Sequence, residues 1–416
     1  MGSRQGRDAL RAADPWTRRL AVAVLAVLSV WPLWVAVAAF LGRLPVGGVD
    51  FKAYYLAGLR VRHGLPLYEP ALIEAVPPPR AIRYLYPPVV ALPFAALTVL
   101  PPLPARVAFV GAQFALLWGG VVALLWGYGI ELTGRGTLAV GWLVAGVQPV
   151  VFASRIGNLT GVLAGLLCLS GALTVAPAGR DRPFVGGALA ALAAVPKPYV
   201  APAGAHLRAD RRRLLGGGLA VGAVVAGSLL LFGPETVRAY AGVLARGEAW
   251  GGARPVSGLS RHYRPFARLP ETRTAIQAAL LAVAAVTALL ARPGDEQLAF
   301  GMGCVAVPLV APSADTLTLL VAGPGLLVVF LVEWRRDGRP AVVLAGALAV
   351  QTSVYFVRVL VQYGPEYAPG LPWASARTVV VVQPATVGLL AVFWLCVWRL
   401  WTGRLATHST PFIPAR

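Results

Sequence analysis

Charged side chains are scarce in this chain of 416 residues. Only 13% of its residues are Asp, Glu, Lys or Arg, whereas 57% are hydrophobic, and the mean hydropathy is +0.69. An ordinary soluble domain carries about a quarter of its residues as charged side chains. The composition therefore excludes a water-soluble globular fold and predicts a chain that lies mostly in a bilayer.

Cysteine and histidine are also rare, and they lie far apart in the sequence. The chain contains only Cys168, Cys304, Cys396, His63, His206, His262 and His408. None of them shows the CxxC or HExxH spacing that is typical of a zinc or haem site. The glycine clusters at 216–218 and 251–252 lack the strand-to-helix setting of a nucleotide-binding loop. We therefore expect no metal and no cofactor.

Acidic residues are few as well, since 17 Asp and Glu stand against 37 Lys and Arg, a formal net charge of +20. In a soluble protein this excess would suggest nucleic acid as a partner. Here the arginines flank apolar runs and form no single basic face. Nucleic acid is therefore not expected, and membrane lipids are the expected partners.

Long apolar runs are what the chain has in abundance. A helix needs about 20 predominantly apolar residues to cross the hydrocarbon core of a bilayer, and about twelve such runs follow one another. The predicted spans are 20–41, 87–101, 105–127, 137–153, 159–176, 184–205, 214–232, 275–291, 297–312, 315–332, 340–361 and 378–400. The sequence thus predicts one all-α polytopic membrane domain over residues 1–416, with about 12 transmembrane helices.

The positions of the arginines predict the topology. Five arginines precede the first span, which by the positive-inside rule places the N-terminus in the cytoplasm. Alternation through twelve spans puts the clusters Arg208–Arg213 and Arg335–Arg339 on the same side. The larger segments then left outside are 42–86, 233–274 and 362–377. We expect a multi-pass protein of the cytoplasmic membrane.

The middle outer segment is unusual because it carries seven arginines, from Arg238 to Arg273. A guanidinium group matches the geometry of phosphate oxygens, so this cluster could hold a lipid-linked phosphate. A general affinity for anionic lipid explains it equally well. The sequence leaves both interpretations open.

Polar and aromatic residues follow the first span. Asp50-Phe51-Lys52-Ala53-Tyr54-Tyr55 opens a stretch that runs to Tyr68, and Tyr86-Pro87-Pro88 comes later. This block resembles the signature after the first helix of glycosyltransferase family 87. Its members are GT-C-fold enzymes that use polyprenyl-phosphate sugars, notably as alpha-1,2-mannosyltransferases. Three later segments, Arg155–Thr160, Ala194–Pro198 and Ala311–Asp315, are similar to further motifs of that family.

The resemblance implies a polyprenyl-phosphate sugar as the donor and a cell-envelope glycolipid or glycan as the acceptor, with inversion at the sugar. Mannose is the donor sugar it implies first. Many members carry aromatic and histidine residues near the late turn, where this chain has Ser313-Ala314-Asp315-Thr316. Arabinofuranose therefore stays open as the donor sugar.

The resemblance implies that Asp50 is the general base, which takes the proton from an acceptor hydroxyl. The residues after it fit a short helix in the membrane interface, with Tyr54 and Tyr55 as aromatic anchors. The alternative is that Asp50 only caps this helix, since Asp is a favoured N-cap residue.

Nine further residues are candidates for binding the donor or the acceptor: Lys52, Tyr54, Tyr86, Asn158, Lys197, His262, Arg264, Asp315 and Arg358. Arg358 is expected near the outer end of its helix and is the first candidate for the donor phosphate, unless it only snorkels to the interface. Arg264 and Lys197 follow in that order. Lys197 lies between two prolines in an apolar run, where a structural partner explains it equally well. Asp315 is alternatively a helix cap.

A secondary transporter or lipid flippase would show similar hydropathy. Transporters of this size often consist of two related halves with matching broken helices. This chain shows no internal repeat, and its candidate acid follows the first span instead of lying at mid-membrane. The sequence therefore favours a membrane glycosyltransferase that acts on the outer face of the cytoplasmic membrane.

Overall fold

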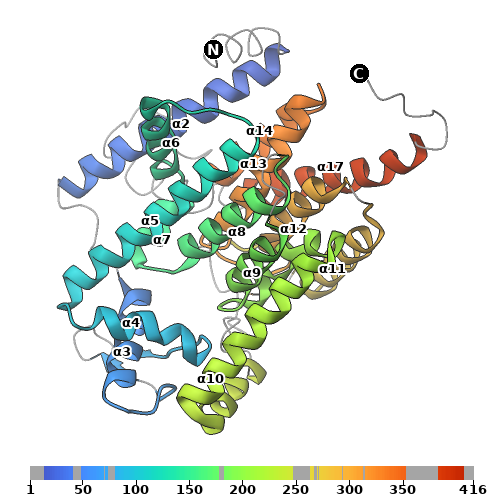
Figure 1. The fold of residues 1–416 in the computed structure, drawn as a ribbon. Helices are drawn as coiled ribbons and strands as arrows, with labels where there is room; N and C mark the ends of the chain where they lie inside the picture. The colour runs from blue at the N-terminus through green and yellow to red at the C-terminus, as the bar shows by residue number, and fades with distance from the viewer. Residues whose placement is uncertain are drawn as a thin grey trace.

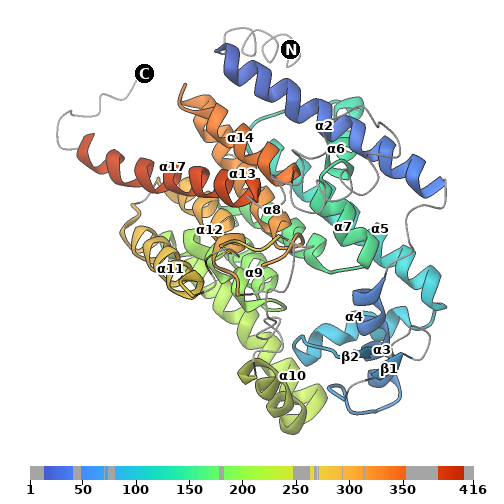
Figure 2. The ribbon, with the colours of Figure 1, turned by 180° about the vertical axis from the view of Figure 1, so that it is seen from behind.

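The chain folds into a helical bundle with one very small sheet (Figure 1). The computed structural model describes residues 14–40, 48–69, 71–73, 80–177, 182–246, 263–266, 269, 271–292, 294–312, 314–352 and 383–406. Figures 1 and 2 show α3 (Val49–Arg62), α4 (Leu92–Leu97) and the kinked end of α10 (Arg211–Ala245) at the lower end of the molecule. The first turn of α2 (Pro15–Phe40) lies at the top. We call the lower end the α3 end.

The elements follow one another with short connections. After α3 come β1 (Ala71–Ile73), β2 (Arg80–Ile82), η1 (Pro88–Ala91), α4, α5 (Pro102–Gly127), α6 (Gly134–Ala145), α7 (Gln148–Ile156), α8 (Thr160–Thr174), α9 (Pro183–Ala194), η2 (Pro198–Ala209) and α10. The remaining elements are α11 (Arg273–Leu290), α12 (Glu296–Val310), α13 (Leu319–Arg335), α14 (Pro340–Gln351) and α17 (Pro384–Ala406). The two strands pair antiparallel, with Leu72 opposite Ala81.

Within the described part of the chain, five helices are long and apolar enough to cross a membrane: α2, α5, α10, α11 and α17. α6 and α7 together make a sixth, bent by 70° at their junction. α8, α9, α12 and α14 are apolar but shorter. The chain is thus a helical multi-pass membrane protein, as predicted, but the twelve crossings are not confirmed.

The core of the bundle is formed by α8, α12 and α13, which are buried along most of their length. Leu163, Leu167, Phe300 and Leu309 are almost fully enclosed there. Around this core, α10 and the first half of α2 expose leucines and valines, as expected for helices that face lipid.

The predicted span 87–101 is wrong as a membrane crossing. The segment forms only η1 and the six-residue α4, because prolines interrupt it. Both of its ends stay beside α3. Tyr54 donates a hydrogen bond to the hydroxyl of Tyr86 at 2.9 Å, and Tyr55 donates to the carbonyl of Leu100 at 2.9 Å. The segment therefore begins and ends at the α3 end.

The predicted span 184–205 is not a single helix either. α9 ends at Ala194, and η2 begins at Pro198 after a break that contains Pro196 and Lys197. Proline donates no backbone hydrogen bond and disfavours helical geometry in the residue before it, so two prolines flanking one residue end the helix. Lys197 accordingly has extended backbone angles, with φ −136° and ψ 87°.

The two halves of this segment form a hairpin that returns to the start of α10. The N-terminal end of α9 packs closely on α10. A Cβ on Gly216 of α10 would lie only 2.0 Å from the carbonyl oxygen of Phe184, so glycine allows this approach. Near the C-terminal end of η2, Arg213 of α10 donates a hydrogen bond to the carbonyl of His206 at 3.4 Å. Lys197 is therefore the apex of a hairpin that points away from the start of α10.

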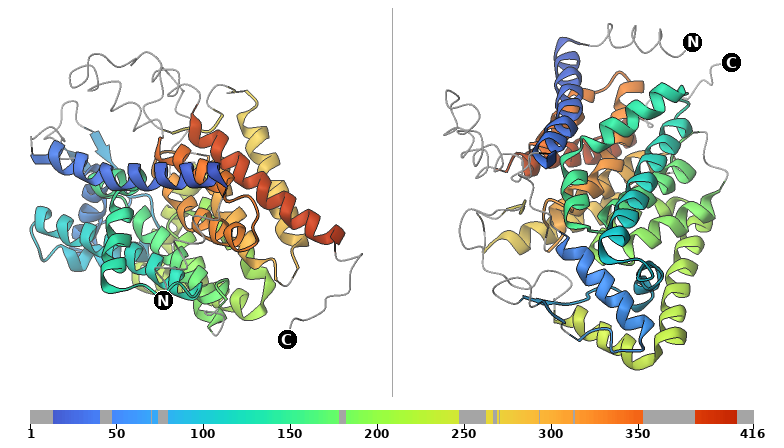
Figure 3. Two further views of the ribbon diagram at one scale, coloured as in Figure 1. Left: turned by 90° about the horizontal axis from the view of Figure 1, so that it is seen from above. Right: turned by 90° about the vertical axis from the view of Figure 1, so that its left-hand side faces the viewer.

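The turns at the other end of the bundle are tied together by hydrogen bonds to backbone carbonyls. The pairs are Arg335 with Tyr128, Arg213 with Thr174 (2.8 Å), Gln297 with Val175 (3.0 Å), and Arg208 with Leu289. The C-terminal ends of α5, α8, η2, α11 and α13 thus lie at one end, which we call the arginine end. It includes both arginine clusters that were predicted to lie on one side. Figure 3 shows the same ribbon from above and from its left-hand side.

Strict alternation through the predicted spans would separate segments that the structure joins. It would place the end of α8 opposite the start of α10, and Asn158 opposite Asp50. With 87–101 kept at the α3 end and 184–205 folded into a hairpin, α5 runs toward the arginine end and α7 returns to α3. The two wrong crossings, 87–101 and 184–205, change the predicted direction of every helix between them. After the second one the predicted sides agree with the structure again.

Candidate active site

Asp50 lies in the first turn of α3, at the α3 end of the molecule. The N-cap of this helix is Gly48, with φ 125°, so the alternative that Asp50 is the cap is not what the structure shows. Tyr54, one turn further, is only 1% exposed and stacks on Phe94 with ring centroids 4.8 Å apart. The interpretation of Tyr54 as an interface anchor was wrong, because the inner face of α3 packs against α4 and α5.

The loop between α7 and α8 brings Asn158 to Asp50. α7 ends in the left-handed Gly157 (φ 70°), and a Cβ there would lie 2.5 Å from the Cβ of Phe51. Only glycine meets both requirements, the positive φ and the close approach to α3. The amide nitrogen of Asn158 then donates to Oδ2 of Asp50 at 2.6 Å. Oδ1 of Asp50 accepts no hydrogen bond from the described residues.

Lys197 reaches the same point from the apex of the α9–η2 hairpin. Its side chain is 9% exposed. Nζ donates to Oδ1 of Asn158 at 3.1 Å and to the hydroxyl of Thr160 at 2.9 Å. The side chain of Tyr199 also acts electrostatically on Lys197. The lysine that sequence analysis placed within a membrane helix therefore lies outside regular structure. With Asp50, Asn158 and Thr160 it forms a hydrogen-bonded group, which we call the Asp50 cluster.

Asp315 approaches the cluster from the turn before α13. Its Oδ1 accepts from the backbone nitrogens of Leu317 (3.0 Å) and Thr318 (3.1 Å), so it caps this turn. The N-cap of α13 itself is Thr318, not Asp315. Its charge also acts on Asp50 and on Lys197. Asp315 is thus both a local cap and the second negative charge of the site.

Tyrosines form one wall of the site. The hydroxyls of Tyr54 and Tyr86 are hydrogen-bonded, and the rings of Tyr84 and Tyr68 continue the wall. Tyr68 stacks on Tyr240 of α10, with centroids 6.0 Å apart and planes at 27°. The first polar segment of the chain and the end of α10 therefore meet through aromatic rings.

Burial raises the pKa of Asp50 above its ordinary value, and the negative charge of Asp315 adds to this effect. The hydrogen bond from Asn158 and the charge of Lys197 act in the opposite direction. Burial also raises the pKa of Tyr86 to about 12, so this hydroxyl stays neutral beside Asp50. A carboxylate with a raised pKa and one free oxygen is suited to accept a proton near neutral pH.

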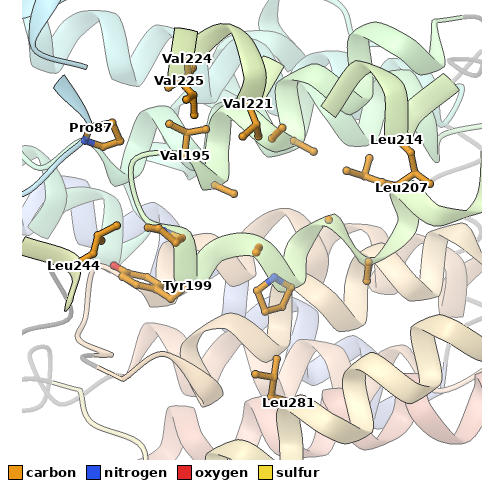
Figure 4. A pocket seen from close by; sticks show the side chains of 18 of the residues that line it. Pro87, Val195, Tyr199, Leu207, Leu214, Val221, Val224, Val225, Leu244 and Leu281 are labelled. Atoms are coloured by element: carbon orange, nitrogen blue, oxygen red, sulfur yellow. The ribbon is translucent and has the colours of Figure 1, made fainter. Parts of the chain in front are cut away.

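An apolar cavity of about 1020 Å³ begins beside this cluster. Figure 4 shows Pro87, Tyr199 and Leu244 near one end of it and Leu207 and Leu214 near the other. One stripe of α10 lines its length, formed by Leu214, Val221, Val224, Val225 and Ser228. From Leu214 to Ser228 this stripe covers about 21 Å of helix. The cavity therefore leads from the Asp50 cluster toward the arginine end.

The other predicted residues do not join the Asp50 cluster. Lys52 is exposed on the outer side of α3. Arg264 lies elsewhere: its backbone nitrogen donates to Gln383 at 2.9 Å, and its charge acts on Arg273. His262 and Arg358 lie outside the described residues.

Sequence analysis missed Thr160 as a member of the cluster and Tyr199 beside it. Thr160 is the last residue of the segment Arg155–Thr160, and Tyr199 directly follows the segment Ala194–Pro198. Their polar side chains within apolar surroundings were the available signal. Among the described residues, no group of three or more His, Cys, Asp or Glu could hold a metal ion.

The sequence profile of glycosyltransferase family 87 matches residues 84–312, which is more than half of the chain. The chain belongs to glycosyltransferase family 87. It is therefore a membrane glycosyltransferase, and the resemblance seen in the sequence is confirmed. The family match does not support the alternative of a transporter or flippase.

The family match includes Tyr86, Asn158, Lys197 and Arg264 but not Asp50 or Asp315. The place of these two carboxylates in the site rests on the geometry described above. Comparison of this glycosyltransferase with curated proteins and with solved structures found no significant match.

Proposed function

We propose that this glycosyltransferase transfers a sugar, mannose in the first place, from a polyprenyl phosphate to a hydroxyl of a cell-envelope glycolipid or glycan. One observation carries the proposal: a partly buried carboxylate with a free oxygen belongs to a cluster that adjoins one end of a long apolar cavity, where Pro87 and Tyr199 line it. A donor with a reactive sugar at one end and an isoprenoid chain at the other matches both features.

In the proposed reaction, Oδ1 of Asp50 takes the proton of the acceptor hydroxyl. The oxygen attacks the anomeric carbon, the bond from that carbon to the phosphate oxygen breaks, and polyprenyl phosphate leaves with the electron pair. Attack opposite the leaving group inverts the configuration at the sugar. The site would contribute a correctly oriented base whose pKa is closer to neutral than that of an ordinary aspartate.

The isoprenoid chain of the donor would occupy the cavity between α10 and the η2–α11 side. The walls are alanines, valines, leucines and prolines, with Tyr199 and Pro87 at the end near Asp50. Val224→Trp should fill part of the cavity and raise the KM for a long-chain donor more than for a short-chain analogue. Leu230→Trp, on the exposed face of α10, is the matched control. Equal effects of the two substitutions would show that the chain binds elsewhere.

Arg264 and Arg273 are proposed to hold the donor phosphate. Arg273 donates to the carbonyl of Pro312 at 2.7 Å, and Pro312 lines the cavity. Its Nε is buried without a partner, and the guanidinium of Arg264 makes no hydrogen bond among the described residues. Two adjacent cations with unused donors at the mouth of an apolar cavity suit a lipid phosphate. Arg358 remains a sequence prediction for the same role.

We place the arginine end in the cytoplasm and the Asp50 cluster at the outer face, following the positive-inside rule. Single cysteines at Asp210 and at Glu131 should react with an impermeant thiol reagent only after lysis, whereas one at Lys52 should react on intact spheroplasts. The three native cysteines are buried and give a low background. Glu131 is decisive, because strict alternation through twelve spans would place it outside.

The decisive assay uses purified protein in lipid nanodiscs, with radiolabelled polyprenyl-phosphate mannose and a cell-envelope lipid extract. We expect labelled product with this donor, and a parallel reaction with polyprenyl-phosphate arabinose compares the two sugars. Transfer from a nucleotide sugar, with none from either lipid donor, would refute the proposed donor class.

A further inference from the structure

Two hydrogen bonds from the ammonium group of Lys197 are directed at groups within the protein. Nζ donates to Oδ1 of Asn158 at 3.1 Å and to the hydroxyl of Thr160 at 2.9 Å. Lys197 is only 9% exposed, and the side chain of Tyr199 acts on it electrostatically. An ammonium group carries three N–H bonds, so at most one is left for a phosphate oxygen.

These contacts determine which way the amide of Asn158 faces. Its Oδ1 accepts from Lys197 and, at 3.0 Å, from the backbone nitrogen of Thr160. A flipped amide would direct its NH₂ group at two donors and its oxygen at a carboxylate. Because the oxygen is held by donors, the nitrogen must face Asp50, and its hydrogen bond occupies Oδ2.

The electrostatic surroundings of Asp50 depend on the same lysine. The groups that face Asp50 are the cation Lys197, the anion Asp315 and the neutral hydroxyls of Tyr54 and Tyr86. Burial and Asp315 favour the protonated form of Asp50, whereas Asn158 and Lys197 favour the ionised form. Loss of Lys197 would thus remove the one positive charge among these groups.

We propose that Lys197 is a positioning residue, which holds Asn158 so that Asp50 stays ionised and keeps Oδ1 directed at the acceptor, and that it does not bind the donor phosphate. This inference rests on the proposed function. It assigns different roles to the two kinds of cation near the site: Lys197 positions Asn158 beside Asp50, and Arg264 and Arg273 face the donor.

The test compares Lys197→Met with the wild type in steady-state kinetics over a range of pH. Loss of a group that orients a catalytic residue typically costs about 10- to 100-fold in activity. We expect a fall of that size in kcat, an acid limb moved to higher pH, and a KM for the lipid donor within about twofold of the wild-type value. Lys197→Arg keeps the positive charge and should restore the acid limb toward its wild-type position. Arg336→Met, an exposed cation at the arginine end, is the control.

A role in phosphate binding predicts the opposite result. The KM for the donor would then rise strongly in Lys197→Met while the acid limb stayed in place, and this outcome would overturn the inference. If Lys197→Met does not fold, Thr160→Val removes one partner of the lysine and should move the acid limb in the same direction by a smaller amount.

A measurement without turnover separates this inference from the proposed function. Infrared difference spectra between the protein and its Asp50→Asn variant follow the titration of Asp50 without any substrate. The pKa of Asp50 should rise when Lys197 is replaced by Met, and an unchanged titration would refute the inference. Failure of the wild type to use any lipid donor would refute the proposed function but leave this titration result intact.

Discussion

Two carboxylates lie at opposite ends of the molecule and are held in different ways. At the arginine end, Glu333 is fully buried, and both of its oxygens are occupied: Arg399 binds them through Nε (2.9 Å) and Nη2 (2.8 Å), and the backbone nitrogen of Arg339 adds a bond of 2.6 Å. At the α3 end, Asp50 accepts one hydrogen bond from a neutral amide and keeps Oδ1 free. Both oxygens of Glu333 thus accept hydrogen bonds, whereas only one oxygen of Asp50 does.

This is the difference expected between a structural carboxylate and a catalytic one, as we propose for Asp50. A buried charge stabilises a fold only when it is paired and its lone pairs are satisfied. Glu333 meets this condition and joins α13 to α17. Asp50 does not, and burial raises its pKa. An incompletely satisfied acid is a cost to folding that a catalytic site explains.

The largest expected effect is that of Asp50→Asn. Because the amide keeps the size of the side chain but cannot accept the proton, transfer should fall by about 10² to 10⁴ while the melting temperature stays near the wild-type value. The radiochemical assay and a thermal melt in detergent measure the two quantities. Asp210→Asn, at the N-cap of α10, is the matched control, since Asn caps a helix as well as Asp. Near-normal turnover of the Asp50→Asn variant would show that Asp50, like Glu333, has a structural role only.

Glu333→Gln should show the reverse pattern. The amide cannot accept all the charged hydrogen bonds of Arg399, so the free energy of unfolding should fall by about 1–3 kcal/mol, at the lower end if the partly exposed Arg399 turns to solvent. Transfer per folded molecule should stay near normal. Denaturant titration followed by tryptophan fluorescence gives the stability, with the exposed Glu131→Gln as the control. Lost transfer at unchanged stability would contradict a structural role.

Asn158→Ala should change the pH dependence of activity, because Asn158 is hydrogen-bonded to Asp50. The hydrogen bond from Asn158 lowers the pKa of Asp50, so its removal raises that pKa further. The base works only when it is ionised, and activity is lost as the pH falls through its pKa. The acid limb of kcat/KM should therefore move to higher pH, with the smallest loss of activity at alkaline pH. An acid limb that does not move would show that another group titrates there.

Chelation should have the smallest effect. Lys197 already places a positive charge beside Asp50 and Asp315, and the described residues contain no cluster of metal ligands. EDTA should leave the rate of transfer nearly unchanged. A loss restored by added Mg²⁺ or Mn²⁺ would show that a metal ion, and not the arginine pair, holds the phosphate.

Hydropathy determined the class of the protein but not the path of its chain. Apolar length alone predicted crossings at 87–101 and 184–205, yet the first segment stays beside α3 and the second is a hairpin. The prolines at 87, 88, 93, 196 and 198 were visible in the sequence. Hydropathy cannot distinguish a helix that is broken but crosses the membrane from a segment that turns back to its own side. Both bury the same apolar side chains. Only the contacts of Gly216 with Phe184 and of Arg213 with His206 show the return.

The amino-acid sequence by itself determined the membrane class, the family, and a set of candidates that includes Asp50, Asn158 and Lys197, because composition and local motifs are properties of the chain. The tertiary structure decided which candidates act together. Asp50 and Asn158 are 108 positions apart, and Asn158 and Lys197 are 39 apart. Their contact depends on a left-handed glycine against α3 and on a proline-flanked apex. Hydrogen bonds act over about 3 Å, so only three-dimensional packing could bring Lys197 to Asn158 and leave Oδ1 of Asp50 free.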